Sequence, residues 1–262
     1  MLSAVRSIFS FFWFAARRAR RNRVFILVCG LPVLAAVVIL LRRIFSPGQG
    51  PDGLRVFSDM IMAFYLQFIV LVLALFYGTS VVSEEVENKT LTYLTTRPVS
   101  KAAIVLGKYA AYTARSILMV GAAVIVSFVL LDFDRLSDGG AWIVLGKSLA
   151  VLILALVAYG AFFTFLGAFL KKSVLFGLFF CFGWENIVQY FPGTTQKLTL
   201  IHYLKSLLGP DASPTNTVQS FLFFRLDPSP VGASIITLAV FTAAALALAA
   251  LVFSGKEYLF EE

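Results

Sequence analysis

The stretch SEEVENKTLTYLTTRPVSKAAIVLGK, residues Ser83 to Lys108, separates two long apolar runs and decides how the chain is organised. Three carboxylates that suit the positive end of a helix dipole directly follow Ser83, a candidate N-cap: Glu84, Glu85 and Glu87. Pro98 ends this helix, because the residue before a proline is disfavoured in the α conformation. The stretch therefore predicts a short amphipathic helix at 83–98, held between two membrane spans and presented to the cytosol.

The composition places the chain in a membrane. Hydrophobic residues make up 60% of its 262 residues and charged residues 14%, against about 25% charged residues in soluble domains. The net charge of +8 is explained by basic residues that flank membrane spans, so it does not indicate nucleic acid. With two cysteines and one histidine, the chain lacks the usual ligands of a zinc, haem or copper site, and we expect no metal or cofactor in it.

The apolar runs predict an all-α polytopic membrane protein with six transmembrane helices. Their expected bounds are 24–41, 57–82, 102–131, 141–170, 174–190 and 231–253. Lysine and arginine are more frequent in the N-terminal segment and in alternate connections, which places both termini in the cytoplasm. We find no internal repeat, so residues 1–262 are expected to form a single membrane domain.

Two further segments are apolar but are not expected to span. Residues 5–20 carry an aromatic stripe followed by arginines, which predicts a helix lying along the cytoplasmic leaflet, with a simple basic anchor as the alternative. Residues 191–230 are too apolar for an ordinary extracytoplasmic loop and predict two short helices in the outer leaflet. In the first of these helices, His202 and Lys205 are expected to lie away from the apolar face, with His202 in contact with solvent.

The opening stretch resembles the permease subunits of type-2 ATP-binding-cassette (ABC) exporters, in the branch that includes permeases linked to multicopper-enzyme maturation. The residues that match the order and spacing of that pattern are Glu84-Glu85, Thr90-Leu91, Leu94, Arg97-Pro98-Val99-Ser100-Lys101 and Leu106-Gly107-Lys108. Lys89 stands where glycine is usual, so a flexible joint is not required there, and Lys101 replaces arginine with the charge kept. The motif covers about a tenth of the chain.

The resemblance implies a permease subunit without its own ATP site, paired with a second copy or a paralogue. It also implies a separate cytoplasmic ABC ATPase that binds ATP and magnesium, in the bacterial inner membrane and among its lipids; a periplasmic partner is left open. The residues implied in coupling to the ATPase are Glu84, Glu85, Glu87, Lys89, Thr90, Leu91, Leu94, Arg97, Pro98 and Lys101. The transported substrate is not readable from the sequence.

Polar residues within the expected spans are candidates for the translocation path or its gate: Glu185, Asn186, Arg115 and Gln67. A carboxylate at the bilayer centre costs about 2.5–3.5 kcal/mol on insertion scales, and less near the interface. Glu185 therefore indicates either a polar position on the path or a protonated or snorkelling residue beside Trp184. Arg115 has the simpler alternative of lying at the inner interface.

Other function classes fit the sequence less well. A proton-coupled secondary transporter using Glu185 is the first alternative, but we find no repeat or pair of interrupted spans. A membrane enzyme would need a Ser–His or paired-Asp arrangement inside the spans, which is lacking. A non-transporting mechanical or assembly complex on the same permease fold stays open. Gly146-Lys147-Ser148 is the nearest approach to a phosphate-binding loop, but it lacks the upstream glycine and lies in an apolar run.

Overall fold

The computed structural model describes Phe9, Trp13 and residues 20–45, 53–87, 101–133, 139–170, 172–188, 194–209 and 229–255. Within these ranges every regular element is a helix, as the sequence predicts. The element order is α2 (Arg20–Phe45), α3 (Gly53–Met60), η1 (Ile61–Ile69), α4 (Val70–Glu87), α6 (Lys101–Leu131), α7 (Gly139–Phe169), α8 (Ser173–Leu178), η3 (Phe179–Glu185), α9 (Asn186–Val188), η4 (Thr194–Leu198), α10 (Leu200–Leu208) and α12 (Val231–Gly255).

Four described helices are long and apolar enough to cross a membrane: Gly53–Val81, Lys101–Leu131, Gly139–Phe169 and Val231–Gly255. Two shorter apolar helices, Val28–Leu41 and Ser173–Val188, coincide with the first and fifth expected spans. The chain is therefore a multi-pass membrane protein. The full count of six spans and the placement of the termini remain predictions from the sequence.

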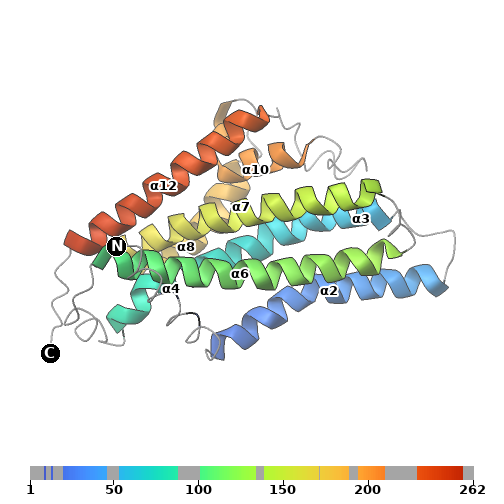
Figure 1. Ribbon diagram of the computed structural model, residues 1–262, viewed down its shortest axis with the longest axis horizontal. Coiled ribbons are helices and arrows are strands. Elements are labelled where there is room, and N and C mark those ends of the chain that lie inside the picture. Colours follow the sequence, from blue (N-terminus) through green and yellow to red (C-terminus); the bar gives the residue numbers. More distant parts are fainter. Residues whose placement is uncertain are drawn as a thin grey trace.

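The helices form one bundle (Figure 1). Helix α7 packs against both α4 and α12, and α2 lies along α6 on the other side of the bundle. We call the end where α4 stops and α6 begins the inner end, and the opposite end, where α3 begins and α6 stops, the outer end. Helix α12 crosses α7 obliquely and lies along one edge of the bundle (Figure 1).

Close packing of α4 on α7 depends on small residues. A Cβ atom on Gly167 would lie 2.6 Å from the carbonyl oxygen of Thr79, and one on Gly78 would lie 2.7 Å from Cβ of Phe163. Tyr159 and Phe163, two large side chains on α7, are fully buried. Small residues let the helix backbones approach closely, which is how helices associate where lipid removes the hydrophobic driving force.

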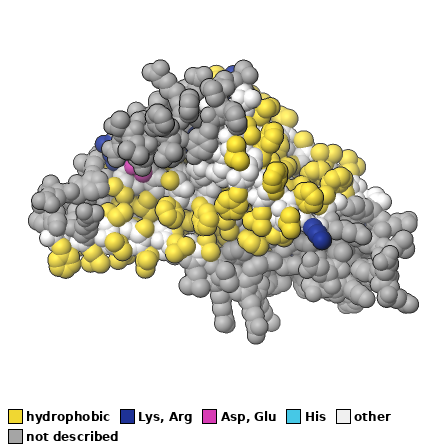
Figure 2. Space-filling view, turned by 180° about the vertical axis from the view of Figure 1, so that it is seen from behind, with side chains coloured by type: hydrophobic (Ala, Val, Ile, Leu, Met, Phe, Trp, Pro, Cys, Tyr) yellow, Lys and Arg dark blue, Asp and Glu magenta, His cyan; other side chains and the backbone are white. Residues whose placement is uncertain are grey.

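The outer surface of the bundle is apolar. Hydrophobic side chains cover much of the described surface seen in Figure 2. Helix α12 is the clearest case, because only 17% of an apolar stretch of 18 residues within it is buried. Exposed aliphatic side chains over this length are consistent with contact to lipid chains rather than to water.

Two local expectations were wrong. Ser83 does not begin a new helix, because α4 continues without a break from Val70 to Glu87. No proline or glycine interrupts the chain between Val81 and Glu87, so the helix propagates past the apolar run. His202 is not in contact with solvent: it is 1% exposed, and Lys205 is 6% exposed.

The burial of both polar residues has one cause. Helix α10 packs on α12, α7 and η1, so its polar side is covered as well as its apolar side. Most of the expected interfacial helix at 5–20, residues 88–98 of the expected coupling helix and the second outer helix after residue 209 lie outside the described residues.

Candidate functional site

The predicted coupling residues fall into three groups. Glu84, Glu85 and Glu87 lie in the last turns of α4, where the structure describes the backbone only. Lys101 begins α6. The remaining ones lie outside the described residues: Lys89, Thr90, Leu91, Leu94, Arg97 and Pro98. The structure therefore places both flanks of the coupling stretch at the inner end of the bundle, and the coupling role stays a prediction.

Lys101 connects this inner end to the last span. Its Nζ donates a hydrogen bond to the carbonyl oxygen of Ser254, at 3.4 Å. Ser254 lies in the last turn of α12, where carbonyl groups lack intrahelical partners and the helix dipole favours a cation. Lys101, a predicted coupling residue, thus caps the C-terminal end of α12.

Lys108 joins the two helices that flank the coupling stretch. It is 1% exposed, and its Nζ donates to the carbonyl oxygen of Ser80 on α4, at 3.5 Å. The same Nζ lies 5.8 Å from the ring centroid of Tyr112, within the range of a cation–π interaction. The ring of Tyr112 in turn lies 5.5 Å from that of Tyr77 on α4, measured between centroids.

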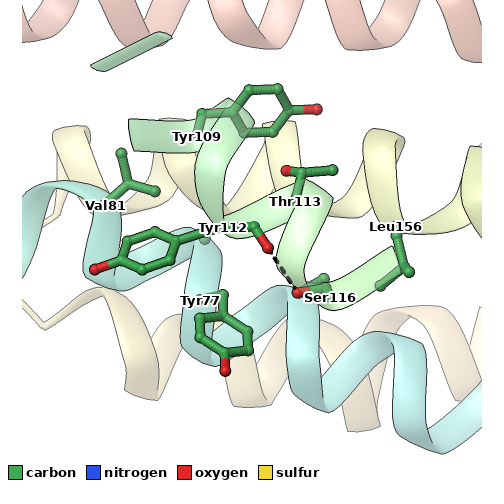
Figure 3. A pocket seen from close by; sticks show the side chains of 10 residues that line it. Tyr77, Val81, Tyr109, Tyr112, Thr113, Ser116 and Leu156 are labelled. Atoms are coloured by element: carbon green, nitrogen blue, oxygen red, sulfur yellow. Dashed lines mark hydrogen bonds between the residues drawn. The ribbon is translucent and has the colours of Figure 1, made fainter. Parts of the chain in front are cut away.

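A small pocket lies beside this junction (Figure 3). Its free volume is about 10 Å³, which is close to what one water molecule needs. The residues that Figure 3 labels come from three helices: Tyr77 and Val81 from α4, Tyr109, Tyr112, Thr113 and Ser116 from α6, and Leu156 from α7.

The polar groups around the pocket are largely engaged within the protein. The hydroxyl of Ser116 donates to the carbonyl oxygen of Tyr112 at 3.0 Å, and the hydroxyl of Tyr109 donates to the carbonyl oxygen of Val157 at 2.9 Å. The pocket is therefore a gap between ring faces rather than a binding site with converging polar groups. Arg115, half-buried, directly precedes Ser116 on α6.

Glu185 lies in a second cluster, where the fifth apolar helix meets α10. Its side chain is fully buried. One carboxylate oxygen accepts a hydrogen bond from the backbone N–H of Leu200 at 3.1 Å, and the other accepts from the N–H of Ile201 at 3.3 Å. These are the first two amides of α10, which have no partner within the helix. A carboxylate at this position satisfies them and is stabilised by the helix dipole.

Gln67 and Asn186 meet directly. The side-chain amide of Gln67, on η1, donates to Oδ1 of Asn186, and Nδ2 of Asn186 donates to the carbonyl oxygen of Cys181 at 2.7 Å. Both η1 and η3 are π-helical, a rare form that is frequently found at functional sites. Glu185 and Asn186 therefore attach the end of the fifth helix to two different elements, α10 and η1.

The polar side of α10 adds the remaining groups of this cluster. Burial lowers the pKa of Lys205 from 10.5 to about 8, and the negative charge of Glu185 opposes that shift. His202 shares a hydrogen bond between its Nε2 and the hydroxyl of Ser229 at 3.0 Å, and the N–H of Ser229 donates to the hydroxyl of Ser206 at 3.2 Å. These bonds tie α10 to the residues that lead into α12.

The structure thus brings together three of the four predicted path residues, Glu185, Asn186 and Gln67, whereas Arg115 lies apart from them on α6. Their role in a path is not tested by this arrangement. Sequence reasoning missed Lys205 and Lys108 as members of these clusters. The available signal was their position: each is a lysine within a mostly apolar helix.

Neither cluster has the residues of a metal or phosphate site. Among the described residues no group of three or more His, Cys, Asp or Glu side chains could hold a metal ion. Gly146, Lys147 and Ser148 lie inside α7, within a continuous helix, and not in a loop whose amides could cradle a phosphate.

Most of the chain matches a known protein family. The sequence model of a family described as ABC-2 family transporter protein matches residues 17–184, which is more than half of the 262 residues. The match begins before α2, includes the whole coupling stretch and ends one residue before Glu185. A search of curated proteins finds no match.

Proposed function

Because the chain belongs to the ABC-2 family of transporter proteins, we propose that it is the permease subunit of an ATP-driven exporter and forms the translocation path as a dimer. The family is one of non-catalytic membrane subunits that work with a cytoplasmic ABC ATPase. We further propose that this ATPase holds the ATP and magnesium and docks on the stretch 83–108. A homodimer and a pair with a paralogue are both compatible with the proposal.

The observation that carries the proposal is the attachment between the two helices that flank the coupling stretch. Lys108 of α6 donates to the carbonyl oxygen of Ser80 on α4, and the rings of Tyr77 and Tyr112 contact each other at a tilt across the same interface. A force applied to the stretch by a soluble partner would act on α4 and α6 as one unit. Because α4 packs on α7 over its length, the displacement would reach the centre of the bundle.

The remaining parts of the proposal follow the sequence. The chain would lie in the bacterial inner membrane with both termini and the coupling stretch in the cytoplasm. ATP binding would draw two ATPases together and shift the 83–98 segment of each permease, and substrate would pass along the interface between subunits. The outer segment 191–230 would cap the exit. The branch linked to multicopper-enzyme maturation is the most specific assignment that the motif supports.

The test is a purification in mild detergent from the native host. The tagged chain is compared with a Glu84→Ala/Glu85→Ala double variant and with Lys197→Ala, which alters an exposed charge on η4, outside the coupling stretch. We expect an ABC ATPase in roughly stoichiometric amount with the parent and the Lys197 variant, and a clear loss with the glutamate variant. The readouts are mass spectrometry of the eluate and its ATP hydrolysis.

Two other outcomes would change the assignment. An ATPase that is recovered equally with all three chains would keep the permease function and remove the glutamates from the docking surface. No ATPase and no ATP hydrolysis with the parent would overturn the proposal. The alternatives would then be proton-coupled transport through Glu185 and a mechanical or assembly role for the same fold.

A further inference from the structure

Two of the apolar helices contain a π-helical segment, and side chains join the two segments. The segment η1 forms nine residues of the second span, between α3 and α4, and η3 forms seven residues near the end of the fifth apolar helix. A π-helix is rare and is usually limited to a single turn within an α-helix. Two such segments in contact therefore indicate a feature that particular residues maintain against the ordinary α-helix.

Asn186, the residue that directly follows η3, makes the contact through both ends of its side-chain amide. Its Nδ2 donates to the carbonyl oxygen of Cys181 at 2.7 Å, and its Oδ1 accepts a hydrogen bond from Nε2 of Gln67 on η1. In an α-helix the carbonyl of Cys181 would accept the backbone N–H of Glu185, four residues later. The side chain of Asn186 therefore competes for the acceptor that an α-helical end of this segment would use.

The backbone at the end of each segment shows the same departure from α-helical bonding. The N–H of Asn186 donates to the carbonyl oxygen of Gly183, three residues earlier rather than four. The N–H of Val70, which follows η1, donates to the carbonyl oxygen of Tyr65, five residues earlier. Both segments thus leave the α-helical register close to where the side chains of Gln67 and Asn186 meet.

The register of η3 determines where the carboxylate of Glu185 lies. Because the hydrogen bonds of α- and π-helices span four and five residues, a change of register would turn Glu185 around the helix axis. In the observed register its two oxygens lie 3.1 Å and 3.3 Å from the amide nitrogens of Leu200 and Ile201. These amides have no partner within α10, so their protection from hydrogen exchange depends on Glu185.

We propose that Gln67 and Asn186 form a register lock, which holds the end of the fifth apolar helix in its π-helical form and so keeps Glu185 on the first two amides of α10. Both are positioning residues: Gln67 acts through Asn186, and Asn186 acts through the helix register. Gln67 belongs to the same continuous helix as Val81 of α4. That a displacement of α4 at the coupling stretch would reach Glu185 through the lock rests on the proposed function, whereas the lock itself does not.

The experiment measures the hydrogen-exchange rates of the Leu200 and Ile201 amides in the purified full-length protein, by mass spectrometry with fragmentation of the peptide that contains them. Gln67→Met removes the amide at similar side-chain length, and Asn186→Leu removes both the acceptor and the donor. Thr164→Val is the matched control, because it removes a buried hydrogen bond that stays within one helix, from the Thr164 hydroxyl to the backbone of α7.

The size of each effect follows from the bonds that the variant loses. Gln67→Met should raise both rates about threefold, which corresponds to about 0.7 kcal/mol and is typical of one hydrogen bond between membrane helices. Asn186→Leu loses two bonds and should raise them about tenfold. In Thr164→Val both rates should stay within about 1.5-fold of the parent, since such bonds within a helix contribute little. Gln67→Asn keeps the amide on a shorter side chain, disturbs the packing less, and should resemble Gln67→Met.

The double variant tests whether the two residues act in series. If Gln67 acts only through Asn186, Gln67→Met/Asn186→Leu should match Asn186→Leu rather than the product of the two single effects. Unchanged rates in both single variants, or multiplied effects in the double variant, would overturn the proposal. An equal rise at the amides of α12 would also overturn it, because the variants would then destabilise the whole bundle. None of these rates depends on an ATPase, so the lock and the transport function can fail separately.

Discussion

Nζ of Lys108 lies 3.5 Å from the carbonyl oxygen of Ser80, within the bundle and out of contact with solvent. This hydrogen bond is one of the contacts that join α4, which leads into the coupling stretch, to α6, which follows it. A buried ammonium group is costly unless it is bonded, and the ring of Tyr112 lies beside it. Lys108 therefore helps to hold α4 and α6 together.

Lys108→Ala should lower stability by about 2–4 kcal/mol, because it leaves a cavity and removes a buried hydrogen bond between α6 and α4. Lys108→Met retains most of the stem volume and should cost less. For a chain of this size the Ala variant corresponds to a fall in apparent Tm of about 4–16 °C. Thermal unfolding in one detergent measures both, and equal Tm values for the Ala variant and the parent would contradict the role of Lys108.

The glycines in the α4–α7 contact give a matched pair of variants. A Cβ atom on Gly78 would lie 2.7 Å from Cβ of Phe163 and 3.0 Å from the carbonyl oxygen of Gly160. On Gly160 it would lie 3.4 Å from the ring of Tyr109 and 3.5 Å from the hydroxyl of Thr113. Gly78→Ala should therefore cost about 1–3 kcal/mol through overpacking, whereas Gly160→Ala should be close to neutral, since alanine also favours the helix.

Thermal unfolding of the two glycine variants under identical conditions measures this difference. The Gly78 variant should unfold at the lower temperature by several degrees. A Gly160 variant that is the less stable of the two would show that the α4–α7 contact relaxes differently from the geometry described.

Substitution of Lys101 tests whether its hydrogen bond to Ser254 contributes to stability. The bond is 3.4 Å long and exposed, and exposed charged contacts contribute about 0–1 kcal/mol. Lys101→Met should therefore leave the apparent Tm within a few degrees of the parent. If Lys101 also contacts the ATPase, the same variant should recover less ATPase in the purification. A large fall in Tm would instead assign Lys101 to the fold.

The long helices could be predicted from the sequence because their bounds depend on the length of the apolar runs. The third span was expected at 102–131 and is found at Lys101–Leu131; the last was expected at 231–253 and is found at Val231–Gly255. These segments contain few residues that compete for another structure, so composition alone defines them.

The polar clusters could not be predicted in the same way, because they depend on contacts between distant segments. The periodicity of α10 shows one apolar face but cannot show that a second helix covers the other, so His202 was wrongly expected to contact solvent. Glu185 stood out as a carboxylate in an apolar run, yet its bonding partners are amides 15 and 16 residues later. Almost every residue has a backbone amide, so the sequence does not indicate which amides bind the carboxylate.

The lowered pKa of Lys205 predicts that the stability of the protein depends on pH. Its pKa is lowered from 10.5 to about 8 by burial, so between these values the folded protein binds fewer protons at this site than the unfolded chain. Stability rises with pH wherever the unfolded state binds more protons. The cost of burying charged Lys205 is therefore fully present below about pH 8 and is relieved as the pH rises from about 8 towards 10.5.

The measurement is the difference in apparent Tm between the parent and Lys205→Met at about pH 7.5 and about pH 9.5, which lie below and above the lowered pKa of Lys205. The apparent Tm of the parent should rise relative to that of Lys205→Met at the higher pH. The Lys197→Met variant should show no such change relative to the parent, because Lys197 is exposed. In a Glu185→Gln background the shift should begin at lower pH, since the carboxylate that raises the pKa of Lys205 is gone. A pH response that is identical with and without Glu185 would separate Lys205 from the carboxylate and leave α10 attached by its backbone amides alone.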